Sequence, residues 1–105
     1  MLVPDVGDLE ASLDAPRLVL LLGKSGCIQC TELAVAASAW SDETRRCVFL
    51  HLDDAAGREL TVKHPFLAHV DMLPAVVPML HGAPLDVLHG HGTDVLDRAW
   101  AQMEA

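Results

Sequence analysis

The apolar run at residues 18–22, Leu-Val-Leu-Leu-Leu, limits the possible folds of this chain more than any other feature. Pro16 precedes the run closely and Gly23 ends it, so its length fits a β-strand and falls far short of a membrane-spanning helix. A strand without polar residues leaves neither face to water, which is typical of a central strand that is covered on both faces. The chain therefore has to supply helices for both faces of a sheet.

The rest of the first half supplies such segments. The spacing of leucines at 5–14 predicts a short helix before the strand. Residues 27–40 contain neither Gly nor Pro and place apolar side chains at helical spacing, so a helix is expected to follow the strand. Residues 47–52 predict a second buried strand, and residues 53–64 predict a further helix that Pro65 stops. The first half thus predicts a βαβ unit.

The second half has the pattern of a hairpin followed by a helix. Residues 75–80 and 84–89 are expected to be antiparallel strands joined by a tight turn, in which Gly82 can take a positive φ. Pro78 has no amide hydrogen for a strand ladder, so we expect it at a bulge or facing an edge. A terminal helix should follow, with Thr93 as its N-cap.

Together these segments predict an α/β protein. With 105 residues, the chain is expected to form a single domain over positions 1–105. The element order predicts a mixed central sheet of about four strands, built from the βαβ unit and the hairpin, with helices on both faces.

The charge of the chain is strongly acidic. Fifteen Asp and Glu residues stand against seven Lys and Arg, giving a net charge of −8. Nucleic acids and anionic membrane surfaces are therefore poor candidate partners. The first residues carry no basic segment and no apolar run long enough for a signal sequence, so we expect a cytoplasmic, non-membrane protein.

Cys27 and Cys30 are the main candidates for chemistry. They are three residues apart at the start of the helix expected at 27–40, where both side chains lie on one face, close enough to form a disulfide. In a reducing compartment such a pair indicates redox chemistry or metal binding, and the spacing alone leaves both open. Amides and the dipole at a helix N-terminus stabilise a thiolate, which favours Cys27 as the nucleophile.

Two neighbouring residues could support that thiolate. Lys24 could add positive charge or hold the carboxylate of a small thiol substrate, although a solvated loop lysine fits the sequence equally well. Because no proline separates the two cysteines, the Gln29 amide could donate to the Cys27 sulfur.

Two motifs in order resemble the thioredoxin and glutaredoxin superfamily. One is the strand, loop and Cys-Ile-Gln-Cys opening a helix; the other is the segment Val-Asp-Met-Leu-Pro-Ala-Val-Val at 70–77, before the hairpin. The resemblance implies a thioredoxin-like fold with a glutaredoxin-like active-site loop, catalytic Cys27 and Cys30, and a cis-proline at position 74. It also implies a substrate-binding set consisting of Lys24, Ile28, Gln29, Leu73, Pro74 and Gly90.

The chain departs from the thioredoxin pattern at three positions. Thioredoxins carry a tryptophan where this chain has Gly26, a buried aspartate where it has Leu21, and a lysine where it has Phe49. The aspartate is the usual proton acceptor for the second cysteine. Either Cys30 uses water or another group, or its deprotonation is slow.

These observations predict a thiol-disulfide oxidoreductase that acts as a reductant on protein disulfides. Its only cofactor would be the Cys27–Cys30 disulfide, and a thioredoxin reductase or a small-thiol system would reset the monomeric protein. One alternative is a dimer that holds zinc or an iron-sulfur cluster through these cysteines, and another is a redox-inert binding module. Cys47 is expected to be a buried hydrophobic residue, and the histidines, including the pair at 89 and 91, are not expected to bind metal.

Overall fold

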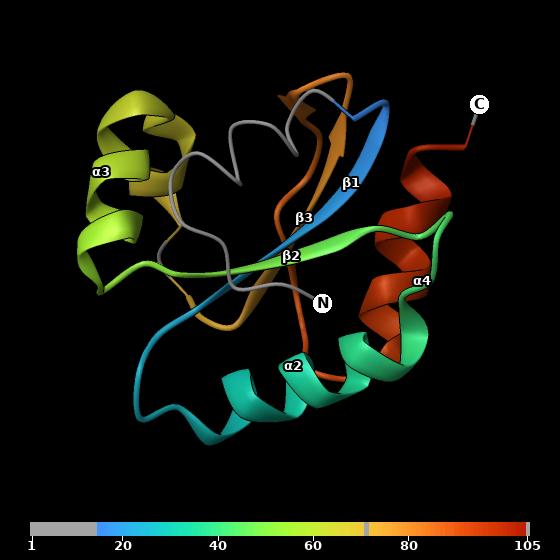
Figure 1. Ribbon diagram of the computed structural model, residues 1–105, viewed down its shortest axis with the longest axis horizontal. Coiled ribbons are helices and arrows are strands. Elements are labelled where there is room, and N and C mark those ends of the chain that lie inside the picture. The colour runs from blue at the N-terminus through green and yellow to red at the C-terminus, as the bar shows by residue number, and fades with distance from the viewer. Residues whose placement is uncertain (1–14, 71, 105) are drawn as a thin grey trace.

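The computed structural model describes residues 15–70 and 72–104, so the helix predicted at 5–14 lies outside the described residues. Within them, the elements occur in this order: β1 (Arg17–Gly23), α2 (Ile28–Trp40), β2 (Cys47–His51), α3 (Ala55–Lys63), the 3-10 helix η1 (Pro65–His69), β3 (Ala75–Leu80), β4 (Ala83–Pro84), β5 (Leu88–His89) and α4 (Thr93–Gln102). Figure 1 shows the strands crossing the middle of the molecule, with helices around them.

The sheet is mixed, as predicted, and β1 lies inside it. The strand order is β2-β1-β3-β4, and β5 also pairs with β3. β1 runs parallel to β2, with Gly23 beside His51, and antiparallel to β3, with Leu22 beside Ala75. The carboxyl ends of β1 and β2 therefore meet at one end of the sheet, where the chain leaves β1 for the two cysteines.

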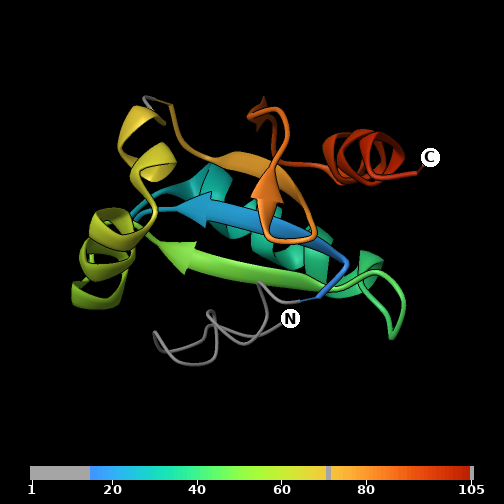
Figure 2. The same ribbon diagram turned by 90° about the horizontal axis from the view of Figure 1, so that it is seen from above.

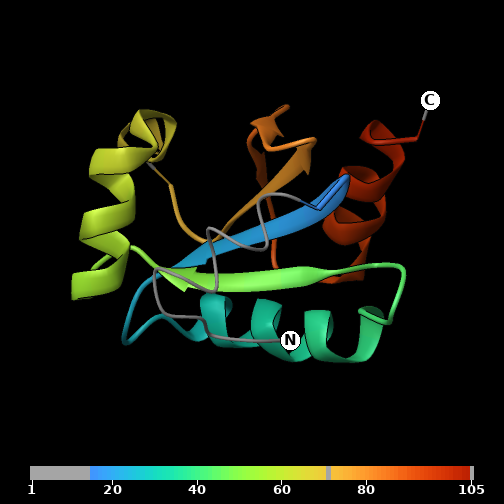
Figure 3. The same ribbon diagram turned by 45° about the horizontal axis from the view of Figure 1, so that its top comes forward.

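The apolar run of β1 divides its side chains between two cores, one on each face of the sheet. Val19 and Leu21 belong to a core formed with α2 and α4, whereas the alternating leucines 18, 20 and 22 belong to a core formed with α3 and η1. Figure 2 shows α3 and α4 at opposite ends of the strands, and Figure 3 shows α2 running along β2. The expectation that helices cover both faces is confirmed.

The strand predicted at 84–89 is wrong in one respect, because it is divided into β4 and β5. Met79 pairs with Pro84, but Val76 pairs with Leu88, so three residues lie opposite two on β3. This extra residue makes a bulge. Pro78 lies opposite it and accepts a 2.9 Å hydrogen bond from the amide of Leu85. In an antiparallel strand the amide nitrogen and the carbonyl of one residue point to the same side. The missing N–H of Pro78 therefore faces the bulge, where the hydrogen bonds between β3 and the last strand are interrupted.

The turns and helix ends mostly follow the sequence. Gly82 has a φ of 80°, as expected for the turn, and Asp54 caps α3 through a 2.7 Å hydrogen bond from the Gly57 amide to its carboxylate. The N-cap of α4 is Gly92, so the prediction of Thr93 is off by one residue. No helix in residues 15–70 and 72–104 has the length and apolar character needed to cross a membrane.

Candidate active site

The two cysteines lie at the amino end of α2 and form a disulfide. Cys27 is the N-cap of α2, and Cys30 lies in its first turn. Their Cα atoms are 5.2 Å apart, within the usual range for a disulfide. The strand-loop-helix arrangement therefore holds both sulfur atoms at the end of the sheet where β1 and β2 finish.

The two cysteines differ in accessibility. Cys27 is half-buried, whereas only 2% of Cys30 is exposed. The Cys27 sulfur accepts a 3.1 Å hydrogen bond from the Cys30 amide, so the donor is not the Gln29 amide that the sequence suggested. The N-cap position explains the difference, because an N-cap side chain accepts from the amide two or three residues later. A partner can thus reach Cys27, and the helix amide stabilises negative charge on its sulfur.

A hydrogen bond across the chain holds the loop before Cys27. The Ser25 amide lies 3.2 Å from each carboxylate oxygen of Asp53, two residues after the end of β2. This amide is the main cause of the lowered pKa of the Asp53 carboxyl group. The sequence assigned Asp53 only to the start of a helix; no spacing rule could connect two residues that are 28 positions apart. Gly26, with a φ of 72°, then turns the chain into α2.

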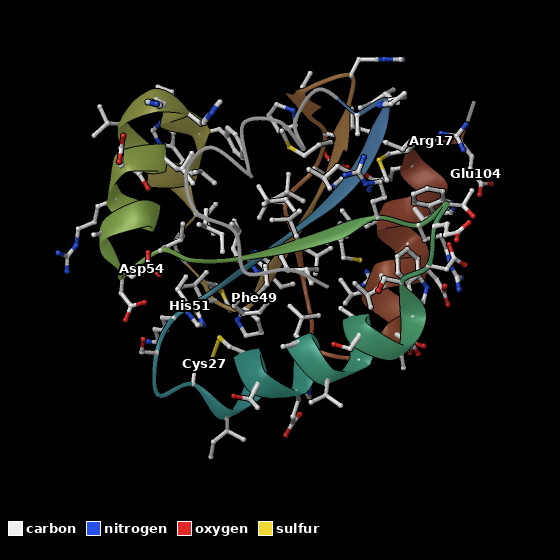
Figure 4. The ribbon with its side chains drawn as sticks, viewed as in Figure 1. Arg17, Cys27, Phe49, His51, Asp54 and Glu104 are labelled. Atoms are coloured by element: carbon white, nitrogen blue, oxygen red, sulfur yellow. A yellow bond between two sulfur atoms is a disulfide. The ribbon has the colours of Figure 1, made fainter. Side chains whose placement is uncertain are left out.

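A hollow of about 410 Å³ opens on the side of Cys30. Its lining includes Cys30 and Thr31 of α2, Phe49 and His51 of β2, and the loop residue Lys24. Figure 4 shows the side chains of Phe49 and His51 extending from β2 toward the cysteine sulfur. The two rings meet edge to face with centroids 5.0 Å apart. The sequence did not single out His51, because its place beside the cysteines depends on the register of β2 against β1.

Gly23 allows the close packing of this region. A Cβ atom built at Gly23 would lie 2.5 Å from the Phe49 ring and 3.1 Å from the Cβ of Cys30. A larger residue would therefore separate Cys30 from β2. Gly23 at the end of β1 thus packs against both the Phe49 ring and Cys30.

The residues expected to bind substrate are spread around the disulfide. Lys24 and Gln29 are exposed, and Ile28 leaves 78% of its surface open to solvent. Leu73 is half-buried against both cores, and its peptide bond to the buried Pro74 is cis. Of these residues, only Lys24 shares the hollow with Cys30.

Gly90 is the remaining residue of that expected set. It has a φ of 154° and lies against Val95 of α4, where an added Cβ would come within 3.1 Å of the Val95 side chain. Glycine is therefore required at this position by both backbone conformation and space.

Cys47 lies apart from the disulfide. It pairs with Val19 at the other end of the β1–β2 ladder and is buried, so the expectation of a buried hydrophobic residue is confirmed. Burial raises the pKa of the Cys47 thiol to about 12. Across the described ranges, no three His, Cys, Asp or Glu side chains are grouped so that they could hold a metal ion.

Comparison with known proteins identifies the fold. No protein-family model matches the sequence, and no curated protein matches it significantly. Solved structures do match: thioredoxin f2 of Chlamydomonas reinhardtii has a TM-score of 0.77 at 16% identity, covering 99% of this chain and 96% of that one. Thioredoxin f from spinach chloroplast, in its long form, has a TM-score of 0.78 at 13% identity, covering 97% of this chain and 84% of that one. Fasciola hepatica thioredoxin has a TM-score of 0.71 at 17% identity, covering 94% of this chain and 91% of that one. The chain has the thioredoxin fold.

Proposed function

We propose that this protein is a thiol-disulfide oxidoreductase that reduces disulfides in partner proteins. The observation that carries the proposal is the asymmetry of the Cys27–Cys30 pair, which joins one accessible and one buried sulfur at a helix N-terminus. A dithiol needs this arrangement if one thiol is to attack a large partner and the other is to break the mixed disulfide afterwards and release that partner. The thioredoxin fold of the chain supports the same activity.

The reaction takes place in two exchanges of bonds. In the first, the thiolate of Cys27 attacks one sulfur of the partner disulfide, forming a mixed disulfide and releasing the other partner sulfur as a thiolate that takes a proton from water. In the second, Cys30 loses its proton and attacks the Cys27 sulfur. The Cys27–Cys30 disulfide forms, and the remaining partner sulfur leaves as a thiol. The partner gains two electrons, which the protein dithiol loses.

The surface around Cys27 supports a protein as the partner. Ile28 directly follows the nucleophile and is exposed, and Met72, which lies just before the segment Leu73–Pro74, is 61% exposed. Exposed apolar side chains beside a reactive group suit contact with a polypeptide. We propose that the backbone at Leu73 pairs with an extended partner segment, by strand addition.

A coupled assay tests this function. The oxidised protein is incubated with NADPH and thioredoxin reductase, or with glutathione, glutathione reductase and NADPH, and reduction of insulin is followed. We expect reduction with at least one system, and loss of that activity in Cys27→Ser. Inactivity of the wild-type protein with both systems would contradict the role as a general reductant. Metal analysis of the purified protein tests the alternative of a dimeric metal site.

A further inference from the structure

We propose that His51 accepts the proton of Cys30 when this thiol attacks the mixed disulfide. The inference rests on the proposed function and names the group that completes its second step. Leu21 stands where thioredoxins carry the aspartate that usually takes this proton. Its side chain is fully buried and has no atom that can accept a proton. Some other side chain, or water alone, has to take it.

The position of His51 follows from the register of the sheet. His51 is the last residue of β2 and pairs with Gly23, the last residue of β1. Gly23 in turn lies against the Cβ of Cys30. His51 of β2 and Cys30 of α2 therefore line the same hollow, and Figure 4 shows the His51 side chain extending from β2 toward the start of α2, where Cys27 lies.

The chemistry of the hollow singles out His51. Among the described residues that line it, Lys24, Cys30 and His51 are the ones that titrate. Lysine ordinarily carries its proton at neutral pH and cannot accept another, whereas histidine exchanges protons readily in this range. A hollow of about 410 Å³ has room for several water molecules, because one takes up about 30 Å³ in the liquid, so the transfer can run through a water.

Two neighbours prepare His51 for this role. The ring of Phe49 packs against the imidazole edge to face at an angle of 79° and limits its rotation. Asp53 follows two residues later, and the charge of His51 contributes to the lowered pKa of its carboxyl group. An imidazolium formed by proton uptake is thus within electrostatic range of a carboxylate.

The proton and electrons balance in this step. The Cys30 S–H bond breaks, its proton passes to a neutral His51 imidazole, and the electron pair on the Cys30 sulfur forms the bond to Cys27. The bond between Cys27 and the partner sulfur breaks, and the partner leaves with that electron pair. His51 then returns the proton to water or to the leaving thiolate.

The reagent dithiobis-nitrobenzoate separates the two steps, because each releases one coloured thiolate. Mixed with the reduced protein, it reports attack by Cys27 in a first phase and closure by Cys30 in a second. A positioned general base contributes about 10²–10⁴ in rate. Since water in the open hollow competes as a base, we expect His51→Asn to slow the second phase by at least about tenfold near neutral pH and to leave the first within about twofold.

The matched control is His81→Asn. His81 lies in the turn after β3, at the opposite end of the sheet, and has a φ of 51°, which asparagine tolerates. We expect both phases of this variant to equal those of the wild type. External imidazole should restore the second phase of His51→Ala, a rescue that a merely structural defect would not allow.

The pH profile gives the decisive reading. The other titratable groups around His51 are Lys24 and Cys30, which line the same hollow, and Asp53, which interacts electrostatically with His51. A proton acceptor at position 51 should make the wild-type second phase depend on pH in a way that His51→Asn lacks. An unchanged second phase in His51→Asn, or a slower one with the wild-type pH profile, would overturn the role of His51. A wild-type protein that shows both phases but reduces no insulin would instead contradict the proposed function.

Discussion

Replacing Gly57 by alanine should destabilise the protein, although the same change stabilises most helices. Gly57 lies in the first turn of α3 and is buried. A Cβ atom at this position would overlap the carbonyl oxygen of His51 and lie 2.8 Å from the Cα of Leu52. Both are backbone atoms at the end of β2, so no side-chain rotation can relieve the contact.

The size of the effect follows from two opposing contributions. Alanine is favoured over glycine in a helix interior by about 1 kcal/mol. Additional atoms in a packed region cost about 1–3 kcal/mol. Because the contact at Gly57 is with backbone, we take the upper end of that cost, which leaves a net loss of about 2 kcal/mol. For a domain of this size, such a loss lowers the melting temperature by about 10 °C.

The control is Val62→Ala in the same helix. Val62 is 81% exposed, so this change removes no core contact and should raise helix stability slightly. Urea unfolding followed by circular dichroism measures both variants. A Gly57→Ala protein as stable as the wild type, or more stable, would show that α3 does not pack on the end of β2 as described.

Three further predictions concern single interactions. The pKa of Cys47 is raised to about 12 from an ordinary 9.0, so its thiolate fraction falls about 10³-fold and alkylation of the folded protein should be slow. The stability that comes from this shift is complete below pH 9 and is lost as pH rises toward 12. The free energy of unfolding of Cys47→Ala should lack this dependence on pH. The lowered pKa of Asp53 should make the Ser25 amide signal titrate below pH 3.8 in NMR spectra, since the bond between them is present above the ordinary pKa and lost as pH falls through the lowered one. Trp40→Phe removes the 2.8 Å hydrogen bond from Nε1 to Asp97 and should cost about 2 kcal/mol in urea unfolding, whereas Asp97→Asn keeps an acceptor and should cost little.

The sequence predicted those parts of the fold that depend on local patterns. The unbroken apolar run of β1 predicted a strand with both faces covered by other elements, and the side chains of this strand do alternate between two cores. The cysteine pair was placed correctly at a helix start because the helix of 27–40 has a clear spacing. The bulge opposite Pro78 was anticipated from the missing amide hydrogen, although the resulting split of the last strand was not.

The contacts that complete the site depend on register and could not be predicted from spacing. Asp53 reaches the Ser25 amide only because β2 ends beside the loop that follows β1. The same register places His51 next to Gly23 and so in the hollow that Cys30 also lines. A shift of β2 by one residue would point His51 to the other face of the sheet, and no local pattern fixes that choice.

The division of roles between the two cysteines is the central claim, and trapping of the mixed disulfide tests it most directly. Cys27→Ser and Cys30→Ser, each combined with Cys47→Ala to remove the third thiol, are reduced, freed of reductant, mixed with insulin and analysed by intact-mass spectrometry. Because Cys27 is the accessible sulfur and Cys30 is buried, we predict a covalent adduct with Cys30→Ser and none with Cys27→Ser. Equal trapping by both variants, or trapping by Cys27→Ser alone, would contradict the account.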